Sequence, residues 1–148
     1  MKYIVTYNDA VEMTKAYDNF NFSSKEHEID GYRIVTFNYF LCEYNFFVKP
    51  LKDKDWIHAR DMRGVTFVFN KDGSLYKRFL MLEKFFNVNQ VEETQIHLLR
   101  EKKIKHVTYK EDGSLVAFMN LPNGKVFAKT QAGFTNEQAN RAMELYET

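Results

Sequence analysis

The chain of 148 residues carries 21 Lys and Arg against 20 Asp and Glu, a net charge of +1, and 45% of its residues are hydrophobic. The apolar content excludes a disordered chain, and the balanced charge excludes a large, uniformly basic surface for nucleic acid while leaving room for a local basic pocket. The single cysteine, Cys42, cannot form an internal disulfide. No apolar stretch has the roughly 20 residues of a membrane span, and the N-terminus lacks the pattern of a signal peptide. We therefore expect one soluble cytoplasmic domain with no membrane partner.

Hydrophobic spacing and turn residues divide the chain into short helices and strands. In chain order, the sequence predicts a helix from Asp9, a strand over 32–40, a charged connection over 49–55, a hairpin with strands over 64–69 and 75–80, a helix over 92–103, strands over 105–109, 114–121 and 125–130, and a helix after Thr135. Asn123-Gly124 has the composition of a hairpin turn. The order predicts an α+β fold, a mostly antiparallel sheet with flanking helices.

The two terminal helices are supported by capping pairs and by apolar stripes. Asp9 with Glu12, and Thr135 with Gln138, have the three-residue spacing of a capping box. The stripes consist of Ala10, Met13 and Tyr17 in the first helix and of Ala139, Ala142, Met143 and Tyr146 in the last. The last helix has no stop signal before Thr148, so we expect the chain to end inside a larger fold.

The most promising chemistry lies at Lys110-Glu111-Asp112-Gly113, where a predicted strand begins. A lysine attacks the α-phosphate of a nucleoside triphosphate only as a free amine, and at its ordinary pKa of about 10.4 fewer than roughly one in a thousand is neutral at pH 7. Neighbouring Lys and Arg side chains and a phosphate-bound Mg²⁺ would lower the pKa of this amine and hold the triphosphate. Gly113 would allow the backbone to approach the nucleotide closely.

Taken alone, these four residues favour a plainer interpretation, a hairpin turn with a solvated lysine beside it. The sequence contains its own decoy, Lys71-Asp72-Gly73, in which the lysine lies one position nearer the glycine. One residue of shift turns a strand side chain to the other face of a sheet. We therefore predict that Lys71 belongs to a turn only.

Three upstream segments change the balance in favour of Lys110. They are Tyr32-Arg33-Ile34 leading to Asn38-Tyr39, Arg63-Gly64, and Leu82-Glu83-Lys84-Phe85-Phe86-Asn87. Their order and approximate spacing resemble those of the phage-type ATP-dependent RNA ligases. From about Tyr32 onward the chain closely resembles the N-terminal part of RNA ligases of the T-even phage tRNA-repair type. The most specific pieces are Lys84-Phe85-Phe86-Asn87 and the segment from Lys110 to Val116.

The resemblance implies that residues 1–148 are the N-terminal portion of an adenylation, or nucleotidyltransferase, domain. Such an enzyme forms a covalent lysyl-AMP and joins RNA 3′-hydroxyl to 5′-phosphate ends. ATP and Mg²⁺ would be its cofactors, and RNA, such as cleaved tRNA, its substrate, in the host cytoplasm if the protein is phage-encoded. The family's later motifs, a metal-supporting glutamate, a Glu-Gly pair and a Lys-x-Lys strand, have no counterpart here. We therefore expect a truncated domain, or a second polypeptide that carries those motifs.

The resemblance also assigns roles to individual residues. Lys110 matches the adenylated lysine, Arg63 and Lys84 match residues that contact the triphosphate, Phe86 matches an aromatic of the nucleotide pocket, and Glu111 and Gly113 accompany Lys110 in the nucleotide-binding segment. Two positions depart from the family pattern. Gln131 stands where a second lysine is expected after Lys129, which would keep part of that role, and Phe37 stands where a tyrosine is frequent. No residue is predicted as a metal ligand, because the four histidines lack paired spacing.

Several alternatives stay open at this stage. Phe86 could be a core residue, and Arg63 could pair with Asp61 or Glu83. For the aromatic residues Phe40, Tyr44, Phe46 and Phe47, core packing is favoured over base stacking, because basic residues do not interleave with them. For the whole chain, the alternative function is a non-catalytic module that binds nucleotide or RNA. The missing distal motifs favour that alternative, and the Lys110 segment counts against it.

Overall fold

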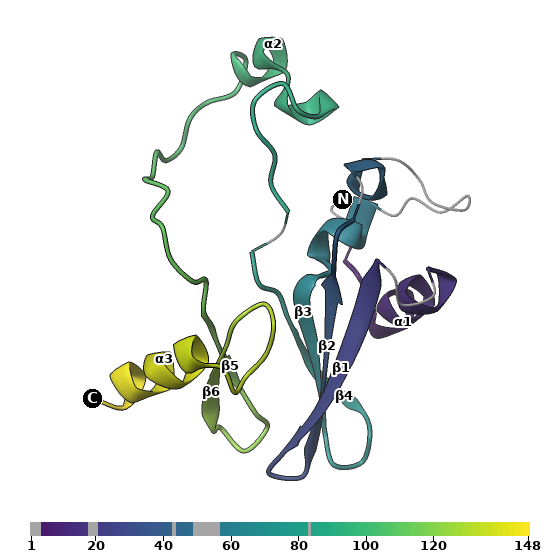
Figure 1. Cartoon of the computed structure of the whole chain (residues 1–148), viewed down its shortest axis with the longest axis vertical. Coiled ribbons are helices and arrows are strands. Elements are labelled where there is room, and N and C mark those ends of the chain that lie inside the picture. The colour runs from purple at the N-terminus through teal and green to yellow at the C-terminus, as the bar shows by residue number, and fades with distance from the viewer. Residues whose placement is uncertain (1–3, 18–20, 43, 49–56, 83) are drawn as a thin grey trace.

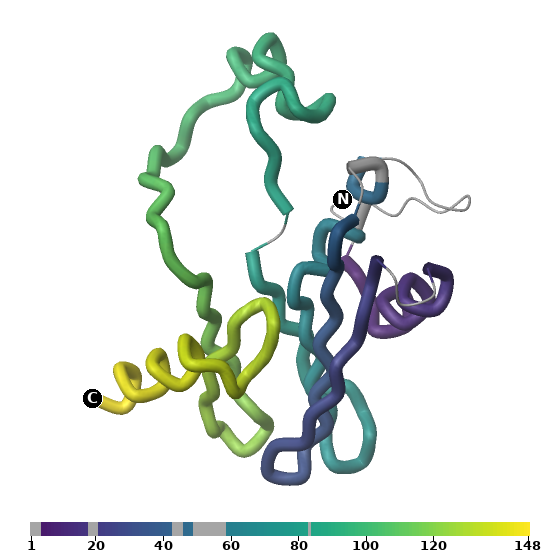
Figure 2. The backbone as a smooth tube through the Cα atoms, viewed as in Figure 1, coloured from purple at the N-terminus to yellow at the C-terminus, as the bar shows by residue number. Residues whose placement is uncertain are grey.

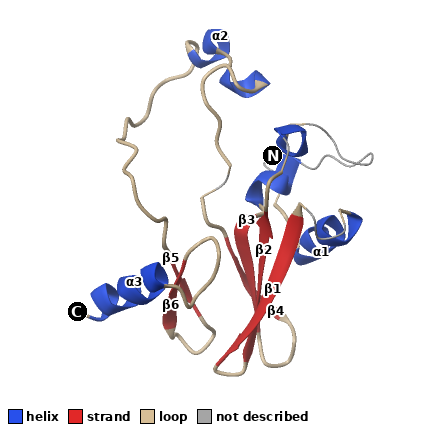
Figure 3. Cartoon of the chain, viewed as in Figure 1, coloured by secondary structure: helices blue, strands red, loops and turns tan. Residues whose placement is uncertain are grey.

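The computed structural model describes the whole chain except residues 1–3, 18–20, 43, 49–56 and 83 (Figures 1 and 3). In chain order its elements are α1 (Tyr7–Ala16), β1 (Phe22–Ile29), β2 (Tyr32–Tyr39), η1 (Tyr44–Phe47), η2 (Ile57–Asp61), β3 (Arg63–Phe69), β4 (Leu75–Phe79), η3 (Glu92–Thr94), α2 (Ile96–Leu99), β5 (Ala117–Asn120), β6 (Val126–Lys129) and α3 (Glu137–Glu147). The η elements are 3₁₀ helices. The predicted connection over 49–55 lies outside the described residues.

The main sheet is antiparallel with the strand order β1-β2-β3-β4, and β5 pairs with β6 in a second, two-stranded sheet. In the central pair, Val35 lies opposite Phe67, and Thr36 lies opposite Thr66. All four of these side chains are buried, so β2 and β3 are covered on both faces. The two antiparallel sheets and the flanking helices confirm the α+β prediction.

Helix α1 covers one face of the main sheet. Tyr7, in its first turn, makes edge-to-face contacts with Phe37, Phe67 and Phe69 at centroid distances of 5.8, 5.5 and 5.0 Å. Such ring pairs contribute about 0.5–1.5 kcal/mol each beyond the area that they bury. Phe37, which stands where the family frequently has a tyrosine, is therefore a core residue here.

The cap of α1 differs from the prediction. The N-cap is Thr6, whose hydroxyl accepts a hydrogen bond from the Asp9 N–H while the Asp9 carboxylate accepts one from the Thr6 N–H. Asp9 therefore occupies the N3 position of the capping box and not the N-cap position, because its carboxylate satisfies the free N–H group of the N-cap residue. The predicted apolar face is confirmed, since Ala10 and Met13 are fully buried.

The other face of the main sheet packs against the β5–β6 hairpin. This second core consists of Ile34, Val68, Met119, Leu121, Phe127 and Phe134. Ile34 lies opposite Val68 in the register, on the face that α1 does not cover. The hairpin is thereby fixed beside β3, although the 37 residues 80–116 lie between the end of β4 and the start of β5.

Strand β1 was not predicted from the sequence. Its sequence, FSSKEHEI, is polar, and Phe22 is its one fully buried side chain. It forms because β2 offers a complete antiparallel partner from Phe22↔Tyr39 to Ile29↔Tyr32. Charged residues on an edge strand also discourage pairing with other molecules, which explains why hydrophobic alternation is weak there.

The helix predicted over 92–103 is wrong in extent. The structure has the short η3 and α2, separated by Gln95 with φ −63° and ψ 135°, an extended conformation. The Asn89 carboxamide oxygen accepts a hydrogen bond from the Ile96 N–H at 2.8 Å, so a side chain takes a donor that a continuous helix would use. Such local side-chain bonds compete with helix formation.

The strand predicted over 105–109 is also absent from the described residues. Residues 100–116 run from the end of α2 back to β5 as an extended strap that lies apart from both sheets over most of its length (Figure 2). Val107 and Tyr109 are 86% and 94% exposed, and none of the strands that the structure describes pairs with this segment. The predicted strand over 114–121 is shortened to β5 for the same reason.

At the C-terminal end, helix α3 is confirmed but starts from a different cap. Asn136, and not Thr135, is the N-cap, and its carboxamide oxygen accepts a hydrogen bond from the Ala139 N–H at 2.9 Å. Of the predicted apolar stripe, Ala139 is fully buried, and Tyr146 lies exposed against the Phe118 ring at 5.1 Å. None of the helices that the structure describes has both the length and the apolarity to cross a bilayer.

Gly64 provides a test of how closely the hairpin approaches β3. Its φ is +85°, and a Cβ there would lie 2.9 Å from Met81 Cγ and 3.3 Å from Gln131 Cα. Gly73 has the same φ of +85° but open space around its Cβ position.

We expect Gly73→Ala to lower the free energy of unfolding by about 1 kcal/mol, and Gly64→Ala by about 1 to 3 kcal/mol more. Urea unfolding of both variants checks this, and equal losses would contradict the packing.

Candidate active site

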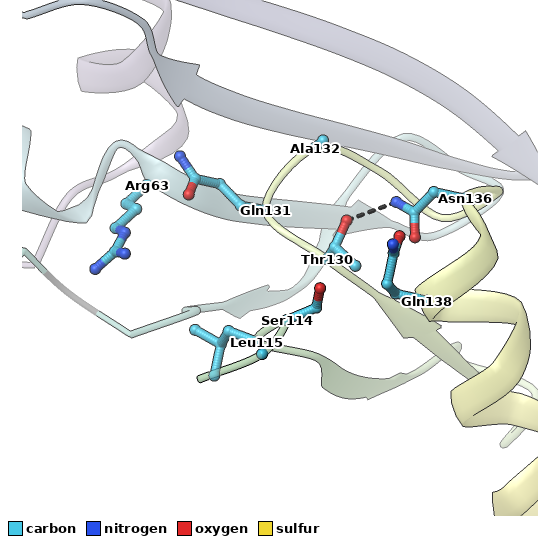
Figure 4. A pocket seen from close by; sticks show the side chains of 9 residues that line it. Arg63, Ser114, Leu115, Thr130, Gln131, Ala132, Asn136 and Gln138 are labelled. Atoms are coloured by element: carbon cyan, nitrogen blue, oxygen red, sulfur yellow. Dashed lines mark hydrogen bonds between the residues drawn. The ribbon is translucent and has the colours of Figure 1, made fainter. Parts of the chain in front are cut away.

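A cavity of about 480 Å³ lies where β3, the end of the strap and the start of α3 meet. It is lined by Arg63, Gly113, Ser114, Leu115, Thr130, Gln131, Ala132, Asn136 and Gln138 (Figure 4). Its volume falls within the range of small-molecule sites. Three segments far apart in the sequence thus form one wall around it, in which polar side chains alternate with apolar surface.

Asn136 holds the loop between β6 and α3 against the cavity. Its amide nitrogen donates hydrogen bonds to the Thr130 hydroxyl at 2.6 Å and to the Gly133 carbonyl at 3.3 Å, while its oxygen caps α3 (Figure 4). In addition, the Thr130 N–H donates to the Gly133 carbonyl at 2.9 Å. One side chain therefore fixes both the loop and the first turn of the helix.

Arg63 supplies the positive charge of the cavity wall. It is the first residue of β3, and its guanidinium carbon also lies 5.9 Å from the centroid of the Phe85 ring. Of the two alternative partners considered for it, Asp61 lies 4.0 Å from Arg78. The other alternative partner, Glu83, lies outside the described residues. Arg63 is thus placed where it could contact an anionic ligand.

Lys129 is fully buried beneath the cavity and does not line it. Its ammonium donates a hydrogen bond to the Gly64 carbonyl at 3.1 Å and lies 5.7 Å from the centroid of Phe134. Burial lowers the pKa of Lys129 to about 8. Burial also lowers the pKa of His27, with smaller contributions from the charges of Lys25 and Lys129. The Lys129 amine therefore loses its proton at a lower pH than an ordinary lysine does, because its burial disfavours the charged form.

Lys84 and Phe86 belong to a neighbouring cluster and not to the cavity wall. The Phe86 ring lies 4.7 Å from the Arg60 guanidinium carbon and 5.9 Å from the Lys84 ammonium. Lys84 also lies 5.6 Å from the centroid of Phe47. Arg60 donates a hydrogen bond to the Phe47 carbonyl at 2.9 Å and pairs with Glu93. Phe86 is therefore half-buried between two cations. It is neither a fully buried core residue nor part of the cavity wall, the two roles that the sequence left open.

Lys110 lies on the exposed strap, three residues before the cavity wall. Its side chain is 81% exposed, and its ammonium lies 3.9 Å from the carboxylate of Asp112. Glu111 is exposed as well, whereas Gly113 lines the cavity. The structure brings Arg63 and Gly113 together, but it does not assemble Lys84 and Lys129 around the Lys110 amine as the sequence analysis expected. The reason is that none of the described strands pairs with the strap, so its side chains stay exposed.

The other sequence interpretations are resolved in part. Lys71 lies in the turn after β3, as predicted, and its ammonium is 5.1 Å from the centroid of the Tyr32 ring. Phe47 is buried, and Phe46 packs against the core between α1 and the main sheet, as core packing predicts. Phe40, in contrast, is 66% exposed. The Tyr44 side chain lies outside the described residues.

Comparison with known protein families gives a match to an RNA ligase family model over residues 61–148. The chain belongs to the RNA ligase family. The match covers more than half of the chain and includes the whole cavity wall together with Arg63, Lys84, Phe86, Lys110 and Lys129. Membership implies RNA as the substrate class. A comparison with curated proteins gives no match.

The sequence analysis missed the polar residues contributed by the loop before α3 and by its first turn. Thr130, Asn136 and Gln138 line the cavity, although none was predicted as a site residue. A signal was present, because a strand end followed by a helix N-cap gathers polar side chains at one edge. Residue type alone did not single them out, because the polar side chains of this part of the wall are neutral amides and hydroxyls.

The buried ammonium of Lys129 predicts a pH dependence of stability. The folded chain releases this proton near pH 8, whereas the unfolded chain keeps it up to about 10.5, so the unfolded state binds more protons in that window. Stability should therefore rise between these pH values, by roughly 3 kcal/mol in wild-type protein relative to Lys129→Met. Urea unfolding across this range measures it. Lys125→Met, which removes an exposed lysine of the same hairpin, is the control, and a pH-independent difference for Lys129→Met would contradict the assignment.

Proposed function

We propose that this member of the RNA ligase family is ATP-dependent, that it forms lysyl-AMP at Lys110, and that it joins RNA 3′-hydroxyl to 5′-phosphate ends. The observation that carries the proposal is the cavity that Arg63 shares with Gly113, the glycine of the Lys110-Glu111-Asp112-Gly113 segment. Those residues fall within the matched part of the chain. An arginine beside a glycine, which lets backbone approach closely, suits a phosphorylated nucleotide.

Reaction at the cavity requires the strap to close. From Gly113 to Lys110 the backbone spans at most about 10 Å, and the lysine side chain adds several more, so the amine can reach the cavity. Gly113 has φ +154° and open space around its Cβ position, which allows rotation at this point. We therefore place the hinge at Gly113, with the strap closing when nucleotide fills the cavity.

In the closed state, the residues of this chain would divide the work. The neutral amine of Lys110 attacks the α-phosphorus of ATP, an N–P bond forms, the bond to the β-phosphate oxygen breaks, pyrophosphate leaves and the amine loses its proton. The Arg63 guanidinium binds phosphate oxygens and disfavours the ammonium form of Lys110. Ser114 and Thr130 offer hydroxyls, and Gln131 and Gln138 offer amides, on the cavity wall. Mg²⁺, held chiefly by phosphate oxygens and water, would neutralise charge on the leaving group.

A second function is favoured by one observation. In the open strap, the ammonium of Lys110 faces a carboxylate, Asp112, and not the cations that its activation needs. A module that binds nucleotide or RNA without forming a covalent bond needs no such activation. The two functions differ in whether AMP becomes attached to the chain.

Covalent labelling separates the two functions. Wild-type chain incubated with α-labelled ATP and Mg²⁺ should retain label through denaturation, and Lys110→Ala should retain none above background. Lys110→Arg, which keeps the charge but not the nucleophile, should behave in the same way. Lys71→Ala is the matched control from the decoy segment and should label like wild type.

Label that survives Lys110→Ala would reject the assignment of the nucleophile. If wild-type chain binds ATP in calorimetric titration but takes up no label, this chain by itself binds nucleotide without forming lysyl-AMP.

A further inference from the structure

Phe85 is an exposed aromatic side chain next to the cavity, and nothing in the active-site chemistry uses it. Its side chain is 56% exposed, and it lies against the guanidinium of Arg63, 5.9 Å from ring centroid to guanidinium carbon. Arg63 also lines the cavity, whereas Phe85 does not. One cation is therefore shared between the cavity and an aromatic surface outside it.

The backbone that carries Phe85 is held firmly on both sides. The Lys84 N–H donates to the Arg60 carbonyl at 3.2 Å, and the Phe86 ring is packed between Arg60 and Lys84. Residues 84 and 86 are thus both tied to Arg60, whereas the Phe85 side chain between them stays 56% exposed. The Phe85 ring is thus presented to solvent from a fixed support.

A preorganised, exposed aromatic ring beside an arginine is what single-stranded nucleic-acid sites use. A base stacks on the ring, and the cation binds the adjoining phosphate. Charge complementarity favours this occupant, because Arg63 lies against the Phe85 ring and is not among the residues that form an ion pair in the described structure. An apolar partner would gain nothing from this charge.

We propose that Phe85 and Arg63 form a stacking site for one unpaired base of the RNA substrate, at the rim of the cavity. The nucleobase could in principle come from ATP, but Phe85 lies outside the residues that line the cavity, which favours RNA. The site rests on the RNA substrate of the family and not on lysyl-AMP formation. RNA binding can therefore be tested separately from adenylation.

The test is the affinity of the full chain for a short, fluorescently labelled single-stranded oligoadenylate, measured by anisotropy without ATP. Phe85→Leu should weaken binding by about 5- to 150-fold, the range for loss of one stacked base, while Phe85→Tyr, which keeps the ring, should bind within about twofold of wild type. Val88→Ala is the matched control, because Val88 is also 56% exposed and lies three residues further along the same segment. It should bind like wild type.

A second arm identifies the source of the base. An oligomer with abasic sites in place of its bases should bind wild type more weakly than the intact oligomer, and should bind Phe85→Leu and wild type equally. ATP binding by Phe85→Leu, followed by calorimetry, should be unchanged. Urea unfolding checks that Phe85→Leu is folded.

Three results would overturn the stacking site. They are an absence of RNA binding by wild type, equal RNA affinity of Phe85→Leu and wild type, and a loss of ATP affinity in Phe85→Leu that matches its loss of RNA affinity. A failure of labelling at Lys110 would reject the proposed function and leave this site untouched.

Discussion

The two sheets are joined by a hydrogen bond from the buried Lys129 ammonium to the carbonyl of Gly64. This hydrogen bond joins the last residue of β6 to the start of β3, beneath the cavity. A buried cation with one acceptor is costly unless the surrounding packing holds it in place. The second hydrophobic core supplies that packing, and the lack of a side chain at Gly64 lets the ammonium and Met81 approach the backbone.

Local pattern was enough to predict the centre of the fold. The strands over 32–39, 63–69 and 75–79 combine apolar or aromatic residues with a turn of fixed composition, so sequence and sheet agree. The pattern failed where a neighbour decides the outcome. Strand β1 is polar and forms because β2 pairs with it, whereas residues 105–109 have strand-forming residues and no partner. Helix 92–103 failed because the Asn89 side chain captures an N–H group that the helix needs.

The candidate site shows the same division between what residue types indicate and what tertiary structure adds. Family resemblance pointed to Arg63, Gly113 and Lys110, and the RNA ligase family match includes all three. The structure joins Arg63 and Gly113 in one wall and leaves Lys110 on an exposed strap. Residue spacing could not reveal the neutral wall from Thr130 to Gln138, because its position depends on how α3 follows β6.

Asn136 couples the cavity to helix α3. Its amide is divided between the Thr130 hydroxyl and the first turn of the helix, so a bound molecule that takes the hydroxyl for itself releases one side of the carboxamide. The Ala139 N–H, held by the other side of the same group, would then experience a changed hydrogen bond. Its amide resonance in an NMR spectrum would therefore report occupancy of the cavity from inside the helix, without any label on the ligand.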